Sequence, residues 1–240
     1  MNKNPIVILH GWGLSGRTFD PLERELRKRG YRVFVPDFPG FGQAVLPSKP
    51  LSLDDYAVFL GDYLNKESLR APILIGHSFG GRVSLKYQLL YPKDVRAIIL
   101  TGTPGFTPVD RKKLILFIVL AKIGKAFFYL PPFSLIQDAV RRWYYYLVGA
   151  RDFYRAEGVM RETFKYIVQE NLLESMKAVR VPCRLIWGEN DAIVPVSVAQ
   201  KMKEVIPGAT LDIIKEAGHG IPYKNPKVFA DHLTAFFQSL

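Results

Sequence analysis

Six short apolar runs recur along the chain, and each ends close to turn residues. They cover residues 5–10, 31–35, 72–75, 95–100, 183–187 and 210–214. Apolar residues fill most of these runs continuously, which is typical of strands covered on both faces. Between them lie stretches with helical spacing, at residues 21–29, 53–65, 81–91, 196–205 and 226–240. Strands that alternate with helices predict a largely parallel sheet with right-handed crossovers.

The alternation stops between residues 106 and 175. This segment has the spacing of several helices and no convincing strand, and it is rich in aromatic residues. In an α/β chain, such a stretch is typical of an insertion over the carboxyl edge of the sheet, where ligands bind. We therefore predict a core formed by residues 1–105 and 176–240 and a helical cap formed by residues 106–175.

Composition agrees with an ordinary folded domain. The chain has 240 residues, of which 48% are hydrophobic and 23% are charged, so it is not disordered and is long enough to bury a core. Its one cysteine, Cys183, excludes an intramolecular disulfide and a zinc site built from cysteines. A single cysteine fits a reducing compartment, so we expect a cytoplasmic protein.

Charge and hydropathy restrict the partners. The net charge of +11 is spread along the chain, whereas nucleic-acid binders concentrate basic side chains on one face. The densest basic segment, residues 24–29, reads as a solvated helix face. The longest uninterrupted apolar run, residues 114–121, is too short to span a membrane. We expect a monomer or homodimer with no nucleic-acid partner and no membrane contact, although the stretch 114–130 leaves surface binding to an anionic membrane as an alternative.

A candidate nucleophile lies in Gly76-His77-Ser78-Phe79-Gly80, which matches the pattern G-x-S-x-G. A strand-like run precedes this motif and a helical stretch follows it, which is the setting that the pattern requires. The tight turn would lift the Ser78 hydroxyl above the sheet. The start of the following helix favours negative charge that develops there.

A serine hydroxyl needs a general base, and the base needs an orienting acid. His219 lies between two glycines in a loop that follows the last strand-like run. Asp191 follows the run 183–187, and Glu189 is the fallback acid. Along the chain, the order Ser78, Asp191, His219 is the one expected with this serine motif. It differs from the two orders in which serine proteases carry their triad residues.

A second loop supplies candidate hydrogen-bond donors. His10-Gly11-Trp12-Gly13 follows the first strand-like run, and a turn flanked by glycines can aim a backbone N–H at the serine. The amides of Trp12 and Phe79 would together stabilise the oxyanion of a tetrahedral intermediate.

With these motifs the chain resembles the α/β-hydrolase superfamily, as a carboxylesterase-like serine hydrolase with a helical cap. The resemblance covers essentially the full length and rests on the motifs at residues 10–13, 37–42, 76–81, 188–195 and 218–219. It implies a mostly parallel sheet of the eight-stranded type, flanked by helices and carrying an inserted cap. It also implies cleavage of carboxylic esters with short to medium acyl chains through an acyl-enzyme on Ser78, without a metal or organic cofactor.

Aromatic side chains are the candidate walls of the substrate site. They are Phe41, Phe106, Phe117, Phe127, Phe128, Trp143 and Tyr144. Those that face the site would favour apolar groups of a small-molecule ester.

Two further alternatives stay open. The same triad serves carbon–carbon hydrolases and menaquinone-pathway synthases, and Arg82, Arg141 or Arg142 would then bind a carboxylate unless these arginines are simply exposed. Carbon–carbon hydrolases often carry Trp after the triad histidine, where this chain has Gly220. The second alternative is a ligand receptor on a hydrolase scaffold. Such receptors often lack a member of the triad, and all three candidates are present here.

Overall fold

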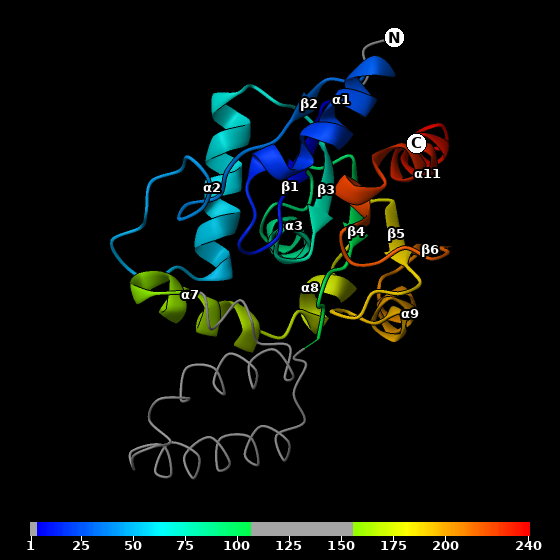
Figure 1. Ribbon diagram of the computed structural model, residues 1–240. Coiled ribbons are helices and arrows are strands. Elements are labelled where there is room, and N and C mark those ends of the chain that lie inside the picture. Colours follow the sequence, from blue (N-terminus) through cyan, green and yellow to red (C-terminus); the bar gives the residue numbers. More distant parts are fainter. Residues whose placement is uncertain (1–3, 107–155) are drawn as a thin grey trace, which may run out of the picture.

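A computed structural model of the chain describes residues 4–106 and 156–240, and these residues form the predicted parallel sheet (Figure 1). The strand order is β2-β1-β3-β4-β5-β6, and each pairing is parallel. Where the sequence predicts a sheet of the eight-stranded type, the described residues supply six strands. Their bounds are Ile6–Leu9 (β1), Val33–Phe34 (β2), Ile73–His77 (β3), Ala97–Thr101 (β4), Cys183–Gly188 (β5) and Thr210–Ile214 (β6).

Alternate residues of the central strands face two different core layers. In β1, Val7 and Leu9 pack into one layer, whereas Ile6 and Ile8 pack into the other. All four residues are fully buried. Because both faces of the strand are covered, the run contains no polar position, and its apolar pattern is continuous.

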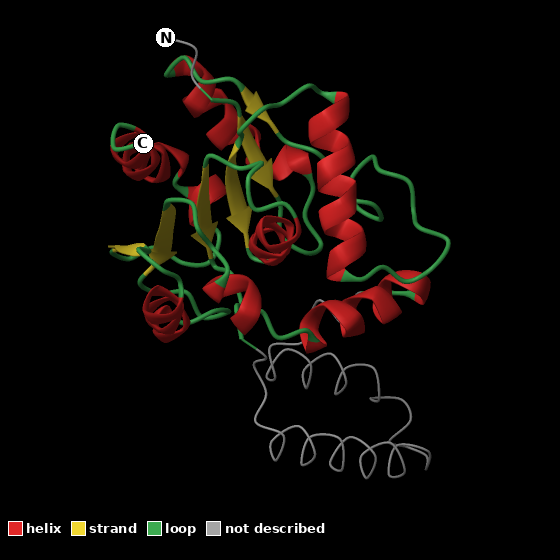
Figure 2. Cartoon of the chain, turned by 180° about the vertical axis from the view of Figure 1, so that it is seen from behind, coloured by secondary structure: helices red, strands yellow, loops and turns green. Residues whose placement is uncertain are grey.

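Helices cover both faces of this sheet. One side holds α2 (Leu53–Lys66), α3 (Phe79–Leu90), α8 (Leu173–Lys177) and α9 (Val196–Val205). The other side holds η1 (Gly16–Phe19), α1 (Asp20–Lys28), α10 (Ile221–Lys224) and α11 (Pro226–Phe237). Figures 1 and 2 show α1 beside α11 on one side of the strands and α2 on the other. The sheet is therefore the middle of three layers.

Local sequence fixes where α2 begins. The Ser52 hydroxyl accepts a hydrogen bond from the Asp55 backbone N–H at 3.2 Å, and the Asp55 carboxylate accepts one from the Ser52 N–H at 2.7 Å. This reciprocal pair satisfies two of the free N–H groups that every helix start exposes. It explains why the predicted and observed starts of this helix coincide at Leu53.

One further helix, α7 (Gly158–Gln169), lies across the end of the molecule toward which the strands point (Figure 1). Its Thr163 hydroxyl accepts a hydrogen bond from the Leu51 N–H at 3.0 Å, which ties it to the loop before α2. α7 and α8 are the described part of the predicted cap. Residues 107–155 lie outside the described residues, so the division into core and cap stays a prediction.

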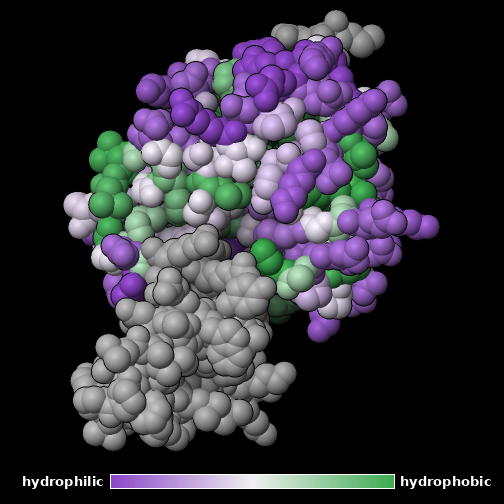
Figure 3. Space-filling view, viewed as in Figure 1, coloured by the Kyte–Doolittle hydropathy of each residue, from purple (hydrophilic) through white to green (hydrophobic). Residues whose placement is uncertain are grey.

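The surface over α1 is hydrophilic (Figure 3). Arg27 pairs with Glu23 at 2.8 Å, and Arg29 pairs with Glu25 at 2.7 Å. Arg24, Arg27 and Lys28 are exposed, as predicted for a solvated helix face, whereas Arg29 is mostly covered and also pairs with Asp231 of α11 at 2.7 Å. Within residues 4–106 and 156–240, no helix combines the length and the apolar character that a membrane span requires.

Candidate active site

Ser78 has a backbone conformation that few side chains adopt. It lies between β3 and α3 with φ 52° and ψ −111°, and a positive φ at a residue other than glycine is strained. Hydrogen bonds on both sides hold this turn: the Ser78 N–H donates to the Thr101 carbonyl at 2.9 Å, and the Gly81 N–H donates to the Ser78 carbonyl at 3.1 Å. The motif is therefore the sharp strand-to-helix turn that the sequence predicted.

Glycines around Ser78 let strand and helix approach each other. A Cβ atom at Gly76 would lie 2.5 Å from the Gly81 Cα, and one at Gly80 would overlap the Leu9 carbonyl oxygen. No side chain fits at either place without moving backbone. The pattern G-x-S-x-G is thus a packing requirement of this turn.

His219 and Asp191, the predicted base and orienting acid, contact each other. His219 Nδ1 lies 2.8 Å from Asp191 Oδ2, and the side chains are 14% and 1% exposed. The other carboxylate oxygen of Asp191 accepts hydrogen bonds from the N–H groups of Ile193 at 2.9 Å and Val194 at 2.8 Å. The carboxylate is fixed and accepts only, so Nδ1 of His219 carries the proton and Nε2 is free to act as a base.

The fallback acid, Glu189, is hydrogen-bonded to backbone rather than to His219. Its carboxylate accepts a hydrogen bond from the Glu216 N–H at 3.0 Å, and its own N–H donates to the Ile214 carbonyl at 2.9 Å. These bonds hold the β5 loop against the β6 loop that carries His219. Glu189 therefore stabilises the loop pair, and Asp191 is the residue that contacts the imidazole.

The end of β4 connects Ser78 with His219. Thr101 accepts the Ser78 N–H, and a Cβ atom on the next residue, Gly102, would lie only 2.6 Å from His219 Cε1. Among the described contacts, no hydrogen bond joins the Ser78 hydroxyl to His219. Such bonds are often long in unliganded enzymes and tighten when substrate binds.

The loop expected to supply oxyanion donors is held by His10. The His10 Nε2 accepts a hydrogen bond from the Phe38 N–H at 3.0 Å, so Nδ1 carries the proton and donates to the Gly11 carbonyl at 2.8 Å. Burial lowers the pKa of His10, which favours this neutral form. The ring of Trp12 packs edge-on against the ring of Phe79 at 5.5 Å. The two amides predicted as oxyanion donors thus come from neighbouring segments.

Trp12 also contributes to a cavity of about 510 Å³ whose lining is part apolar and part polar. Its ring lies 4.9 Å from that of Phe41 and 4.9 Å from that of Phe164 on α7. The described lining consists of Trp12, Gly13, Leu14, Gly40, Phe41, Leu46, Ala156, Glu157 and Met160. Neither Ser78 nor His219 is in this set, so Trp12 is the described link between the cavity and the candidate catalytic residues.

Two of the predicted substrate walls belong to the described residues. Phe41 lines the cavity, and Phe106 packs partly buried against the core. Phe164, which sequence reasoning missed, contacts Trp12 because α7 crosses the sheet edge. The remaining predicted walls lie outside the described residues, namely Phe117, Phe127, Phe128, Trp143 and Tyr144.

Arg82 is a buried arginine that binds backbone carbonyls. It is 2% exposed, and its guanidinium donates hydrogen bonds to the carbonyls of Pro104 at 2.5 Å, Ile167 at 2.7 Å and Glu170 at 2.6 Å. The alternative of an exposed Arg82 is therefore wrong, because a basic residue one position after two glycines gives no sign that a distant helix end will cover it. Arg141 and Arg142 lie outside the described residues.

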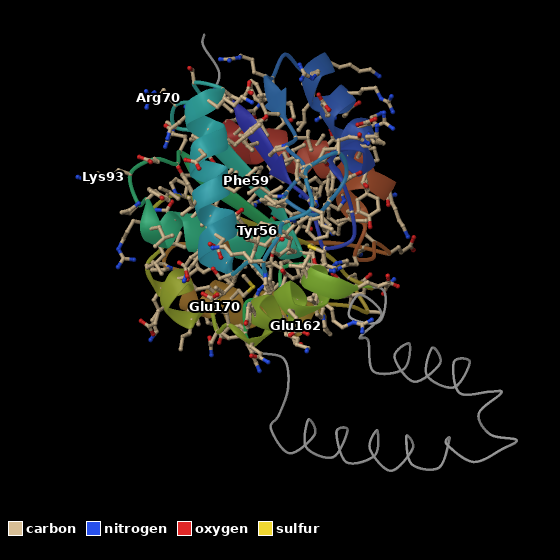
Figure 4. The ribbon with its side chains drawn as sticks, turned by 90° about the vertical axis from the view of Figure 1, so that its left-hand side faces the viewer. Tyr56, Phe59, Arg70, Lys93, Glu162 and Glu170 are labelled. Carbon is tan, nitrogen blue, oxygen red and sulfur yellow. The ribbon has the colours of Figure 1, made fainter. Side chains whose placement is uncertain are left out.

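Arg82 and Lys86 of α3 together hold the carboxyl end of α7. Lys86 pairs with Glu170 at 2.8 Å and with Asp54 of α2 at 3.1 Å. Figure 4 shows Glu170, the residue directly after α7, and Glu162 of α7 beneath α2. Burial lowers the pKa of Arg82 to about 10, so the guanidinium is still charged at neutral pH.

The described residues offer little for metal or thiol chemistry. Among them, no group of three or more His, Cys, Asp and Glu side chains could hold a metal ion. Cys183 is buried in β5, and burial raises the pKa of its thiol to about 12. A thiol in such surroundings is not a nucleophile.

The fold and this site define an α/β hydrolase. The model of the alpha/beta hydrolase family matches residues 6–232, so the chain belongs to that family. Two relatives are Lipase 1 of Psychrobacter immobilis, 26% identical over 97% of this chain and 76% of its own length, and the AB hydrolase superfamily protein YisY of Bacillus subtilis, 27% identical over 98% and 92%. A non-heme chloroperoxidase of Streptomyces lividans is 26% identical over 98% of this chain and 92% of its own length.

Solved structures share the fold. An esterase from Exiguobacterium antarcticum superposes with a TM-score of 0.76 at 22% identity, covering 99% of this chain and 93% of its own. A bromoperoxidase from Bacillus anthracis gives a TM-score of 0.75 at 21% identity, covering 98% and 92%. Sequence identity at this level establishes the fold only. The reaction has to be argued from the residues of the site.

Proposed function

We propose that this protein is a serine hydrolase that cleaves carboxylic esters of short to medium acyl chain through an acyl-enzyme on Ser78. The observation that carries this proposal is the buried pair of His219 and Asp191, 2.8 Å apart. Gly102 connects this pair to a strained serine at the start of α3. A nucleophile, its base and the orienting acid are the three parts that acyl transfer requires.

In the first half of the proposed reaction, the Ser78 Oγ attacks the ester carbonyl carbon while His219 Nε2 takes the hydroxyl proton. Asp191 holds the imidazole in the tautomer with Nε2 free and stabilises the imidazolium that forms. The amides of Trp12 and Phe79 receive the oxyanion. Each such donor contributes about 3–4 kcal/mol to binding of the transition state.

In the second half, the tetrahedral intermediate collapses, and the proton on His219 Nε2 passes to the leaving alcohol. The acyl group stays on Ser78. Water then loses a proton to His219 and attacks the acyl carbon, and a second collapse releases the carboxylic acid and returns the proton to Ser78. No other reactant enters the cycle.

The aromatic contacts of Trp12 support an apolar acyl or alcohol group. The Trp12 ring forms edge-to-face pairs with Phe41, which lines the cavity with it, and with Phe164 of α7. Aromatic side chains at a site favour ligands that bury apolar surface against them. We therefore propose that activity on p-nitrophenyl esters is highest for short to medium acyl chains and falls as the chain lengthens.

Replacement of Ser78 by Ala tests the proposal. We expect Ser78→Ala to abolish hydrolysis of p-nitrophenyl butyrate and labelling by a fluorophosphonate, because the hydroxyl is the atom that each reagent modifies. Ser239→Ala is the control, since its hydroxyl is exposed and donates only to the Phe236 carbonyl. Wild-type turnover in Ser78→Ala would refute the assignment.

A second candidate, hydrolysis of long-chain lipid esters, has support from the relatives. Lipase 1 of Psychrobacter immobilis and Lipase 3 of Moraxella match 97% and 98% of this chain. The same acyl-chain series separates the two candidates. Activity confined to long-chain triglycerides would favour the lipase and contradict the preference for short chains.

Two alternatives to ester hydrolysis are a synthase or carbon–carbon hydrolase with the same triad and a ligand receptor without catalysis. The Arg82 guanidinium is buried and donates from its two terminal nitrogens to three backbone carbonyls, which gives it a role in holding α7 and weakens its case as the group that binds the substrate carboxylate of a synthase or carbon–carbon hydrolase. A panel of organic acids tests that class directly. A receptor without catalysis would bind ligand tightly and fail to react with fluorophosphonate.

A further inference from the structure

The proposed reaction gives no role to His77, the residue immediately before the nucleophile. His77 is 1% exposed and ends β3 on the face opposite α3. The rings of Phe19 and Tyr223 pack edge-on against the imidazole, and each ring centroid lies 5.7 Å from the imidazole centroid. A buried histidine in such surroundings is neutral, and burial lowers the pKa of His77 to about 3.

One ring nitrogen of His77 holds the loop of the catalytic base. His77 Nε2 lies 3.0 Å from the carbonyl oxygen of His219. A carbonyl oxygen only accepts, so Nε2 carries the proton and donates it to this bond. The two imidazole rings lie 4.8 Å apart between centroids, and Gly102 packs on His219 as well.

The other ring nitrogen faces the oxyanion loop. His77 Nδ1 is buried and has no hydrogen-bond partner among the described residues. A Cβ atom at Gly11 would lie 2.8 Å from it, so this loop comes up against the ring only because residue 11 is glycine. His77 therefore touches the loop of the base and the oxyanion loop, and it is bonded covalently to the nucleophile.

We propose that His77 is a positioning residue whose ring sets the relative placement of Ser78, the His219 loop and the 10–13 loop. This inference rests on the proposed function. Without the Nε2–H donor, a partly buried carbonyl of the His219 loop loses its partner, and the loop shifts to find another. A displacement of about 1 Å in catalytic geometry costs on the order of 100-fold in rate.

A pair of substitutions at one position tests this role. In His77→Gln, the side-chain NH₂ can still donate to the His219 carbonyl, whereas His77→Phe fills the space without a donor. We expect His77→Phe to lower kcat about 10- to 100-fold with KM little changed, and His77→Gln to recover most of the loss. His77→Leu is the second variant without a donor, and His232→Gln is the remote histidine control.

A measurement without substrate keeps this inference separate from the proposed function. Proton NMR follows the Nδ1 proton of His219, which the Asp191 hydrogen bond protects from exchange. We expect slow exchange of this proton in the wild type and in His77→Gln, and exchange at least about 10-fold faster in the variants that lack a donor. If the wild type hydrolyses no ester, the proposed function fails, and the exchange rates still decide the role of His77.

Two outcomes would overturn the inference. The first is a folded His77→Phe or His77→Leu variant with wild-type kcat and wild-type exchange. The second is a His77→Gln variant that is impaired as severely as His77→Phe, because the hydrogen-bond donor would then not be the property that matters. Circular dichroism and thermal unfolding establish beforehand which variants are folded.

Discussion

At the scale of single residues, the site depends on places where glycine lets backbone approach a side chain. Gly102 is the clearest case, because a Cβ atom there would lie 2.6 Å from His219 Cε1 and its φ is 56°. Any side chain there faces two separate costs. The left-handed backbone is strained, and the new Cβ displaces the imidazole that the reaction needs.

We expect Gly102→Ala to lower the free energy of unfolding by about 1–2 kcal/mol and to lower kcat as well. Gly208→Ala is a matched control: Gly208 has a φ of 69°, and nothing lies within 4 Å of its missing Cβ. It should lose similar stability and keep its activity. Urea unfolding and ester hydrolysis measure the two effects, and equal activity in both variants would show that the His219 contact is irrelevant.

At the scale of elements, α3 joins the catalytic turn to α7. The helix begins directly after Ser78, and its residues Arg82 and Lys86 hold the carboxyl end of α7. α7 in turn brings Phe164 against Trp12. One helix therefore fixes the nucleophile at one end and a wall of the proposed substrate site along its side.

We expect Arg82→Met to lower the free energy of unfolding by about 2–4 kcal/mol, because it leaves three carbonyls without their donor. Lys86→Met, one turn further along α3, should cost less than about 1 kcal/mol because its ion pairs are partly exposed. Hydrogen exchange in α7 should accelerate much more in Arg82→Met.

The same pair of variants also reports on substrate binding. Because α7 carries Phe164, we expect Arg82→Met to raise KM for apolar esters and to leave labelling of Ser78 by a small fluorophosphonate nearly intact. Unchanged exchange in α7 would contradict the anchoring role of Arg82.

At the scale of the whole molecule, two buried neutral histidines make stability depend on pH. Burial lowers the pKa values of both His10 and His77, and that of His77 falls from 6.5 to about 3. Between these two values the unfolded chain binds a proton at residue 77 that the folded chain does not bind. The contribution of neutral His77 to the free energy of unfolding is therefore fully present above pH 6.5 and is lost as the pH falls toward 3.

We expect the free energy of unfolding to drop on acidification from pH 7 to pH 5, and His77→Gln to reduce this drop. One such proton contributes a slope of at most about 1.4 kcal/mol per pH unit. Urea unfolding at several pH values gives the slopes. His232→Gln is the control, because His232 is 36% exposed. A slope in His77→Gln equal to that of the wild type would contradict the argument.

The sequence alone determined most elements and the position of the candidate nucleophile. Continuous apolar runs predicted the central strands β1, β3 and β4, because a strand covered on both faces has few places for polar residues. The run 210–214 became β6, which is only partly buried and carries Asp212. The start of α2 at Leu53 was predictable from Ser52, and the turn at Ser78 from its glycines, since caps and tight turns depend on near neighbours in the chain.

Only the tertiary structure decided which distant groups meet. Asp191 rather than Glu189 contacts His219, Arg82 is buried under α7, and His77 lies against two separate loops. Each outcome depends on a few ångströms of loop placement between segments far apart in the sequence. Local propensity and spacing constrain neighbouring residues, whereas a hydrogen bond between two loops is set by how the whole sheet and its helices pack.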